Sequence, residues 1–128
     1  MKKDFDAWNR LKKRLDARTG FPFAASPEVW WCALGLNIGV EMNGKDEDFE
    51  RPVIVIRAYS AEMLRIVPLT TRAKQTRFHL KLAEPFAGSF AVVSQARVIS
   101  AKRLVRLIGK LASDDISRLH ALMRELSC

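Results

Sequence analysis

The chain has 128 residues, of which 48% are hydrophobic, and this length and composition suit one domain with a genuine core. Its 22 lysines and arginines outnumber its 14 aspartates and glutamates, so the formal net charge of +8 favours a polyanionic partner such as nucleic acid or an acidic protein. No apolar run approaches the ~20 residues that span a bilayer, and acids rather than the apolar core of a signal peptide follow the basic start. We therefore expect an unprocessed cytoplasmic protein with no membrane partner.

Neither the cysteines nor the histidines form a pattern typical of a disulfide framework or a metal site. Cys32 and Cys128 are far apart in the chain, and no acid or cysteine lies at metal-ligand spacing from His79 or His120. A reduced setting fits this usage, and we expect neither a metal nor another cofactor.

The first predicted element is an amphipathic helix over residues 4 to about 17. Phe5, Trp8 and Leu15 recur at helical spacing, acids occupy the first turn and a glycine follows the end. Since this apolar stripe must be buried, we expect residues 1–20 to be a helical extension that docks on the rest of the chain without forming the active site.

The remaining residues, 21–128, show the pattern of one domain with short β-branched and aromatic segments between turns. The predicted strands cover residues 29–34, 52–57, 63–69, 77–82, 89–95 and 104–111. Their spacing favours a small, strongly curved antiparallel sheet or a partly open barrel. Trp30 and Trp31 alternate on the first strand, so we expect one in the core and the other against the N-terminal helix or, as the alternative, stacked on a base.

The chain is expected to end in an amphipathic helix packed on the sheet. Ser113 followed by Asp114 and Asp115 is typical of a helix start, and apolar residues then recur at 116, 119, 122, 123 and 126. The predicted fold class is therefore mainly β with flanking helices, an α+β arrangement.

Polar residues stand where two of these strands are predicted to begin and end. Pro52 biases Arg51 toward extended backbone, so the guanidinium should emerge from the start of a strand. Thr70 and Thr71 end the strand that contains Pro68. Taken alone, the arginine fits an ordinary surface residue, and the threonines fit β propensity or a turn cap.

Basic residues gather in two stretches. Residues 57–81 contain six of them against one acid, and residues 97–110 contain five and no acid. A nucleic-acid contact and a solvated face explain such runs equally well.

Four features together resemble the MazF/PemK family of toxins, the ribonuclease halves of bacterial toxin–antitoxin pairs. They are the aromatic strand at 29–34, Arg51-Pro52 before an apolar strand, Thr70-Thr71 after the next, and Gln95-Ala96-Arg97. The resemblance covers residues 26–127 and implies a small, SH3-like, partly open barrel of the MazF/CcdB type. It also implies a homodimer, with single-stranded RNA crossing the dimer groove and a cognate acidic antitoxin blocking it.

The resemblance implies that Arg51 and Thr70 form the catalytic pair of a sequence-selective, metal-independent endoribonuclease. The 2′-hydroxyl of the RNA would attack the adjacent phosphorus, and a planar, always charged guanidinium suits the negative charge that develops there. Thr70 would hold the phosphate or the 2′-oxygen by a hydrogen bond. The products would carry a 2′,3′-cyclic phosphate and a 5′-hydroxyl.

We expect further contacts to the substrate from a set of mostly basic and polar residues: Glu41, Lys45, Thr71, Arg72, Lys74, Gln95 and Arg97. For Glu41 a solvated side chain, and for Gln95 and Arg97 a structural tie to neighbouring loops, are open alternatives. Val92 and Ser94 stand where PemK-like members carry an arginine and an aspartate with acid–base roles, so that version of the mechanism is not expected. Two other functions stay open, namely a gyrase-poisoning toxin of the same fold and a non-catalytic nucleic-acid-binding barrel.

Overall fold

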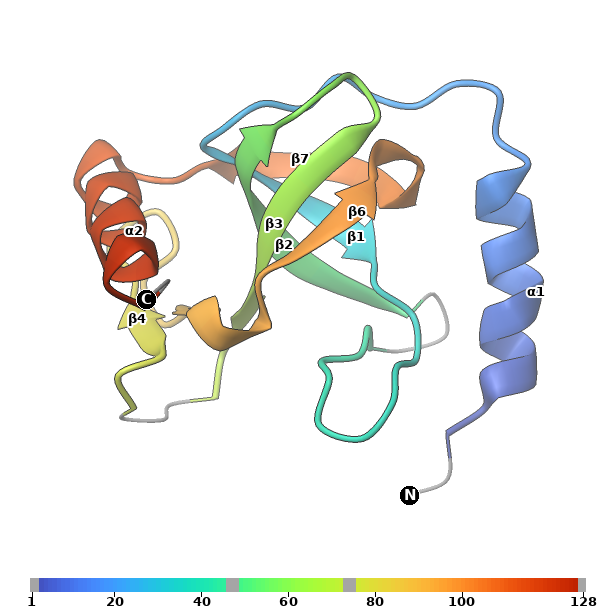
Figure 1. Ribbon diagram of the computed structural model, residues 1–128, viewed down its shortest axis with the longest axis horizontal. Helices are drawn as coiled ribbons and strands as arrows, with labels where there is room; N and C mark the ends of the chain where they lie inside the picture. The colour runs from blue at the N-terminus through green and yellow to red at the C-terminus, as the bar shows by residue number, and fades with distance from the viewer. Residues whose placement is uncertain (1–2, 46–48, 73–75, 127–128) are drawn as a thin grey trace.

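The computed structural model describes residues 3–45, 49–72 and 76–126, which form a curved antiparallel sheet between two helices (Figure 1). The helices are α1 (Phe5–Asp16) and α2 (Ser113–Leu126). The strands are β1 (Glu28–Ala33), β2 (Glu50–Ala58), β3 (Met63–Thr70), β4 (His79–Lys81), β5 (Phe90–Val92), β6 (Arg97–Ser100) and β7 (Leu104–Lys110). Two 3₁₀ turns, η1 (Val93–Gln95) and η2 (Ala101–Arg103), flank β6. The mainly β fold with flanking helices is confirmed.

Strand β3 pairs with two different strands, β6 and β5, along one of its edges. The strand order is β4-β5-β3-β2-β1-β7, and β6 pairs with β3 outside this path. The start of β3, residues 63–66, pairs with β6, whereas its end, Leu69 and Thr70, pairs with β5. All of these pairs are antiparallel. The end of β3 is thereby held against β5 while the start is held against β6.

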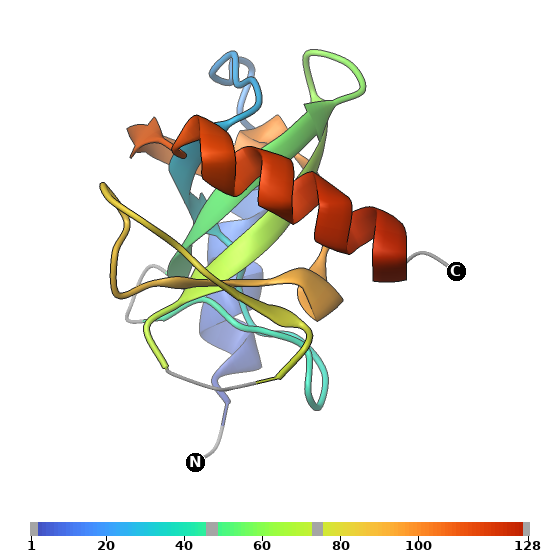
Figure 2. The ribbon, with the colours of Figure 1, turned by 90° about the vertical axis from the view of Figure 1, so that its left-hand side faces the viewer.

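Alternating residues of β2 fill two hydrophobic cores, one on each face of the sheet. Val53 and Val55 are buried in the first core, and Ile54 is buried in the second. This division follows from the strand itself, since successive side chains point to opposite faces. Helix α2 covers the second core with Leu119 and lies across the strands in Figure 2.

Helix α1 packs on the side of the sheet away from α2 (Figure 1). It forms where predicted, and Trp8 is its buried residue. The Trp8 ring contacts Phe49, with 5.7 Å between centroids, whereas the sequence predicted docking near Trp30 or Trp31. Both of those tryptophans already have other neighbours, because Trp30 is buried in the first core and Trp31 lies under the guanidinium of Arg106.

The strand boundaries differ from the prediction at the second half of the sheet. The segment 77–82 is shortened to β4, and 89–95 divides into β5 and the turn η1. Strand β6 was not predicted. Its four residues lie between two 3₁₀ turns and are too few to display a period of two.

Candidate active site

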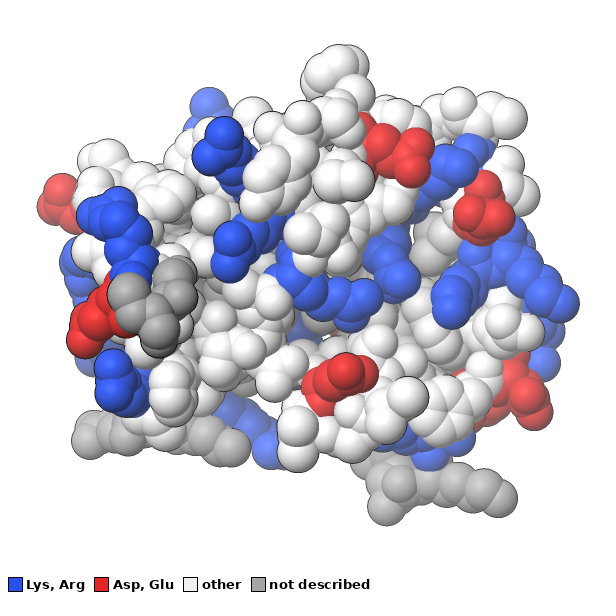
Figure 3. Space-filling view, in the orientation of Figure 1, with Lys and Arg blue, Asp and Glu red and all other residues white. Residues whose placement is uncertain are grey.

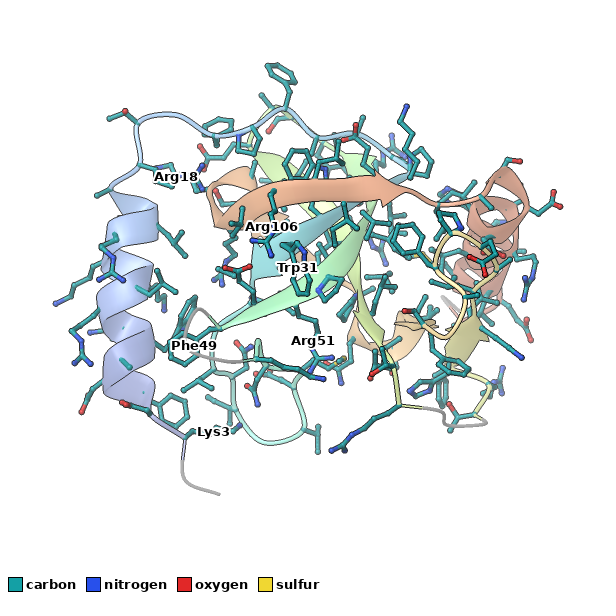
Figure 4. All side chains as sticks on the ribbon, turned by 180° about the vertical axis from the view of Figure 1, so that it is seen from behind. Lys3, Arg18, Trp31, Phe49, Arg51 and Arg106 are labelled. Carbon is teal, nitrogen blue, oxygen red and sulfur yellow. The ribbon has the colours of Figure 1, made fainter. Side chains whose placement is uncertain are left out.

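The site is built around Arg51, the second residue of β2. Arg51 pairs across the sheet with the buried Cys32 of β1, which fixes its backbone. Its Nε–H donates to the Asn43 carbonyl oxygen at 2.8 Å, and an Nη1–H donates to the Leu69 carbonyl oxygen at 3.1 Å. Two of the five N–H donors of the guanidinium therefore hold it between the loop that precedes β2 and the end of β3 (Figure 4).

The Arg51 side chain is half-buried in positive surroundings. Burial lowers the pKa of its guanidinium below the ordinary value, and the charge of Arg72 lowers that pKa further. Both effects disfavour the charged form of the side chain. A bound anion would offset both effects.

Arg51 and Thr70 line the same cavity, which has a volume of about 170 Å³. Thr71 and Lys45 also line it, so four of the predicted site residues come together here. The Thr70 hydroxyl oxygen accepts a hydrogen bond from the Arg72 N–H at 3.2 Å, and its own hydrogen can still donate. The rest of the lining is Trp31, Glu50, Pro52, Leu69 and Ser89.

A second hollow, of about 450 Å³, collects three more of the predicted contacts, Glu41, Gln95 and Arg97. The two hollows are linked by the loop that follows β1. Met42 lines the larger hollow, and its neighbour Asn43 holds Arg51 in the smaller one. The predicted site residues thus fall into two hollows joined by one loop.

The stretch that contains both hollows, residues 26–126, matches the profile of the PemK-like, MazF-like toxins of type II toxin–antitoxin systems. The chain belongs to this family. No match was found among curated proteins.

Solved structures of MazF toxins share the fold at low sequence identity. MazF from Deinococcus radiodurans (form I) has a TM-score of 0.67 and 18% identity, over 84% of this chain and 96% of that chain. A MazE–MazF complex from the same organism (form II) gives 0.64 and 14%, over 82% and 95%. An endoribonuclease in complex with its cognate antitoxin, from a mycobacterial species, gives 0.63 and 12%, over 80% and 92%. At these identities the likeness supports the MazF-like fold alone.

In this MazF-like chain, two of the predicted contacts, Gln95 and Glu41, form hydrogen bonds with the backbone of the loop between β1 and β2. Gln95 accepts from the Met42 N–H at 3.1 Å and donates through Nε2 to the Val40 carbonyl oxygen at 3.3 Å. Glu41 accepts from the Ile38 N–H at 3.0 Å and so closes a turn. These bonds agree with the structural tie that the sequence left open for Gln95.

Sequence reasoning missed two residues of the MazF-like site. The Asn43-Gly44 pair signals a turn, but nothing in it predicts that the Asn43 carbonyl meets an arginine. Arg106 of β7 lies over Trp31, with its guanidinium carbon 5.1 Å from the ring centroid, and reaches a Glu50 carboxylate oxygen at 3.6 Å. Figure 4 shows Arg106, Trp31 and Arg51 in a row. The Arg106 contact depends on the pairing of β1 with β7, which no local motif reveals.

The other predicted contacts are less closely tied to the cavity. Arg72 is exposed, Arg97 pairs in β6 with Ile66 of β3, and Lys74 lies outside the described residues. Across the ranges that the structure describes, no helix is long and apolar enough to cross a bilayer. Across the same ranges, no group of three His, Cys, Asp or Glu side chains could hold a metal ion.

Proposed function

We propose that this toxin-family chain is a metal-independent endoribonuclease that cleaves single-stranded RNA. The observation that carries the proposal is the meeting of Arg51 and Thr70 in one cavity of about 170 Å³. A fixed guanidinium and a hydroxyl donor are suited to a transition state in which negative charge grows around phosphorus.

In the proposed reaction, the 2′-hydroxyl of the RNA gives up its proton to water as its oxygen forms a bond to the adjacent phosphorus and the bond from phosphorus to the 5′-oxygen breaks. The leaving 5′-oxygen takes up a proton, so no net acid or base is consumed. Arg51 stabilises the charge on the non-bridging oxygens with the N–H donors that the two carbonyls leave over. Because those carbonyls already fix the guanidinium, little reorganisation is needed during the reaction. Thr70 donates to a phosphate oxygen or to the 2′-oxygen.

The role of Arg51 in this mechanism is mainly electrostatic. Even with a lowered pKa, the guanidinium is already protonated and has no free lone pair with which to act as a general base, and it can donate its proton only to a stronger base such as the leaving 5′-alkoxide. Donation of a proton to the leaving 5′-oxygen is its second role in the proposal. The products are then a 2′,3′-cyclic phosphate and a 5′-hydroxyl.

The proposed partners are single-stranded RNA, an acidic antitoxin and a second copy of the chain. The net charge of +8 suits both polyanions. Figure 3 shows Lys and Arg side chains across the centre of one face and over α1, with fewer acids among them. Similar folds occur in a MazE–MazF complex and in an endoribonuclease with its cognate antitoxin, which supports the proposed pairing.

The test is a cleavage assay in excess EDTA, with purified wild-type protein and Arg51→Ala incubated with one RNA. We expect the wild type to cut and to leave cyclic-phosphate ends, and the variant to be strongly defective. Activity that disappears in chelator and returns with a divalent ion would overturn the metal-free mechanism. RNA that is bound but never cut would indicate a binding module, and RNA that is neither bound nor cut would indicate a protein target such as gyrase.

A further inference from the structure

Helix α1 buries one side chain against the rest of the chain, that of Trp8. Only 6% of Trp8 is exposed, and its ring contacts Phe49 at 5.7 Å with a tilt of 60°. The guanidinium carbon of Arg103 lies 5.5 Å from the Trp8 ring centroid. Lys3, just before the helix, donates through Nζ to the Asn37 carbonyl oxygen at 2.6 Å. Phe49 and Asn37 belong to the loop between β1 and β2, so the helix rests on the loop that shapes the site (Figure 4).

Gly35 carries the contact from the indole into the loop backbone. A Cβ at this position would lie 2.0 Å from Trp8 Cε2, so the ring fills the space beside the glycine. The positive φ of +76° also favours glycine here. The Gly35 N–H donates to the Phe49 carbonyl oxygen at 3.1 Å, and the Gly35 carbonyl accepts from the Gly44 N–H at 2.7 Å. Trp8 therefore contacts both Gly35 and Phe49, and a backbone hydrogen bond joins these two residues.

The same backbone reaches Arg51 in one further step. A Cβ on Gly44 would lie 1.4 Å from the Phe49 carbonyl oxygen, so these two stretches of backbone are in close contact. The residue before Gly44 is Asn43, whose carbonyl holds the Nε–H of Arg51 at 2.8 Å. A continuous path of contacts thus joins the indole of α1 to the guanidinium in the cavity.

We propose that Trp8 is a positioning residue for Arg51, acting through Gly35, Phe49 and the Asn43 carbonyl. Its effect on cleavage rests on the proposed ribonuclease function, whereas its effect on the geometry of Arg51 does not. The helix lies outside residues 26–126, the stretch that matches the toxin family, so the family region alone does not supply this support. The sequence had predicted only a docked extension.

The far end of α1 provides a matched control. Arg18, just after the helix, donates from Nη1 to the carbonyl oxygens of Lys102 at 2.6 Å and Leu104 at 3.0 Å. The Lys102 Nζ donates in turn to the Asp16 carbonyl oxygen at 3.0 Å. Among the described residues, these bonds fasten the helix to η2 and β7 and involve none of the loop that contains Asn43. Arg18→Gln should therefore loosen the helix without moving Arg51.

The experiment compares Trp8→Leu, Trp8→Phe and Arg18→Gln with the wild type in two measurements. The first is the ¹H–¹⁵N NMR signal of the Arg51 Nε–H, assigned by its loss in Arg51→Lys. The second is steady-state and single-turnover RNA cleavage. Trp8→Leu should shift the signal toward those of solvent-exposed arginines and lower the rate about 10-fold with little change in KM, because misplacing a catalytic group by about 1 Å can cost about 10²-fold. Trp8→Phe should keep most of the wild-type NMR signal position and cleavage rate. Arg18→Gln should change neither the signal nor the rate.

The two measurements separate this inference from the proposed function. If the wild type cuts no RNA, the ribonuclease proposal fails and the NMR signal alone decides the positioning role. An unchanged Arg51 Nε–H signal in folded Trp8→Leu would overturn the inference. So would a loss of cleavage in Arg18→Gln as large as that in Trp8→Leu, since helix docking in general would then explain the effect. If Trp8→Leu does not fold, Phe49→Leu decides, because it breaks the same path at the next residue: a changed signal and rate would support the inference, and a signal and rate identical to the wild type would overturn it.

Discussion

The burial of Arg51 makes the shape of its side chain as important as its charge. Arg51→Lys keeps the positive charge but loses the planar fork that bonds the Asn43 carbonyl and, in the proposed reaction, the phosphate. We expect this variant to be nearly as slow as Arg51→Ala, with a loss of about 10²–10³ in single-turnover rate, as is typical when one preorganised donor is removed. Arg57→Lys, exposed on the same strand, is the control and should cut normally. A lysine variant with near-normal rate would show that charge alone suffices.

Thr70 tests the hydroxyl in the same cavity. Thr70→Val keeps the β-branched shape and deletes the hydrogen-bonding oxygen, so we expect a rate loss comparable to or somewhat smaller than that of Arg51→Ala, about 10²-fold. Thr71 is no control, because it lies beyond the end of β3 and lines the cavity as well. Thr19→Val, exposed and remote, makes the same chemical change elsewhere. Equal rates for the two valine variants would remove Thr70 from the mechanism.

Cys32 predicts how stability depends on alkaline pH. Burial raises the pKa of its thiol from 9.0 to about 12. Because the folded pKa lies above the unfolded one, the contribution to stability is complete below pH 9 and is lost as the pH rises toward 12. Urea unfolding at several pH values should therefore show a steeper alkaline loss for the wild type than for Cys32→Ala. Parallel pH profiles would contradict this.

At the residue scale, the sequence proposed the pair Arg51 and Thr70, which the structure brings into one cavity, but not the contacts that support Arg51. Local pattern placed Arg51 at the start of one strand and Thr70 at the end of the next, but only the resemblance to the MazF/PemK family singled them out as a pair. The Asn43 carbonyl and the Trp8–Phe49 contact could not be predicted, because both depend on the path of the loop between β1 and β2. That loop has no periodicity from which a path can be derived.

At the element scale, two glycines of this loop distinguish strain from packing. Both Gly35 and Gly39 have positive φ, so alanine at either costs about 1–2 kcal/mol of backbone strain. At Gly39 the added Cβ meets nothing within 4 Å, whereas at Gly35 it would collide with Trp8. Gly35→Ala should lose roughly 3 kcal/mol more, because it expels a buried aromatic ring. If the two alanine variants lose equal unfolding free energy in urea, the packing of the Trp8 indole does not require a glycine at position 35.

The elements themselves were predictable where the chain offers enough residues to show a period. Helices α1 and α2 present an apolar stripe, and strands β1, β2, β3 and β7 are runs of six to nine residues rich in β-branched, aromatic or other apolar side chains. All six elements lie close to their predicted bounds. Strands β4, β5 and β6 are each three or four residues long, and they exist because β3 and β5 pair with them. Pairing across the sheet, rather than local pattern, defines such short strands.

At the scale of the whole molecule, the extension at residues 1–20 stays a prediction as a separate unit. The contacts of α1 indicate that the helix is part of the same unit as the sheet. Lys3 and Trp8 contact the loop between β1 and β2 at one end, and Arg18 bonds to β7 at the other. The two helices lie on different sides of the sheet, so α1 leaves the second core to α2 (Figure 1).

RNA binding should depend steeply on salt because the chain carries a net charge of +8. Each phosphate that a side chain neutralises releases counterions, which contributes about 0.7 to the slope of log affinity against log salt for a single strand. Binding is measured with Arg51→Ala, so that the RNA survives, and Arg72→Gln added to it should reduce the slope by about 0.7, since Arg72 lies beside the cavity. Arg124→Gln, exposed on α2, removes the same charge elsewhere and should leave the slope unchanged. An affinity that does not vary with salt would favour a protein target over RNA.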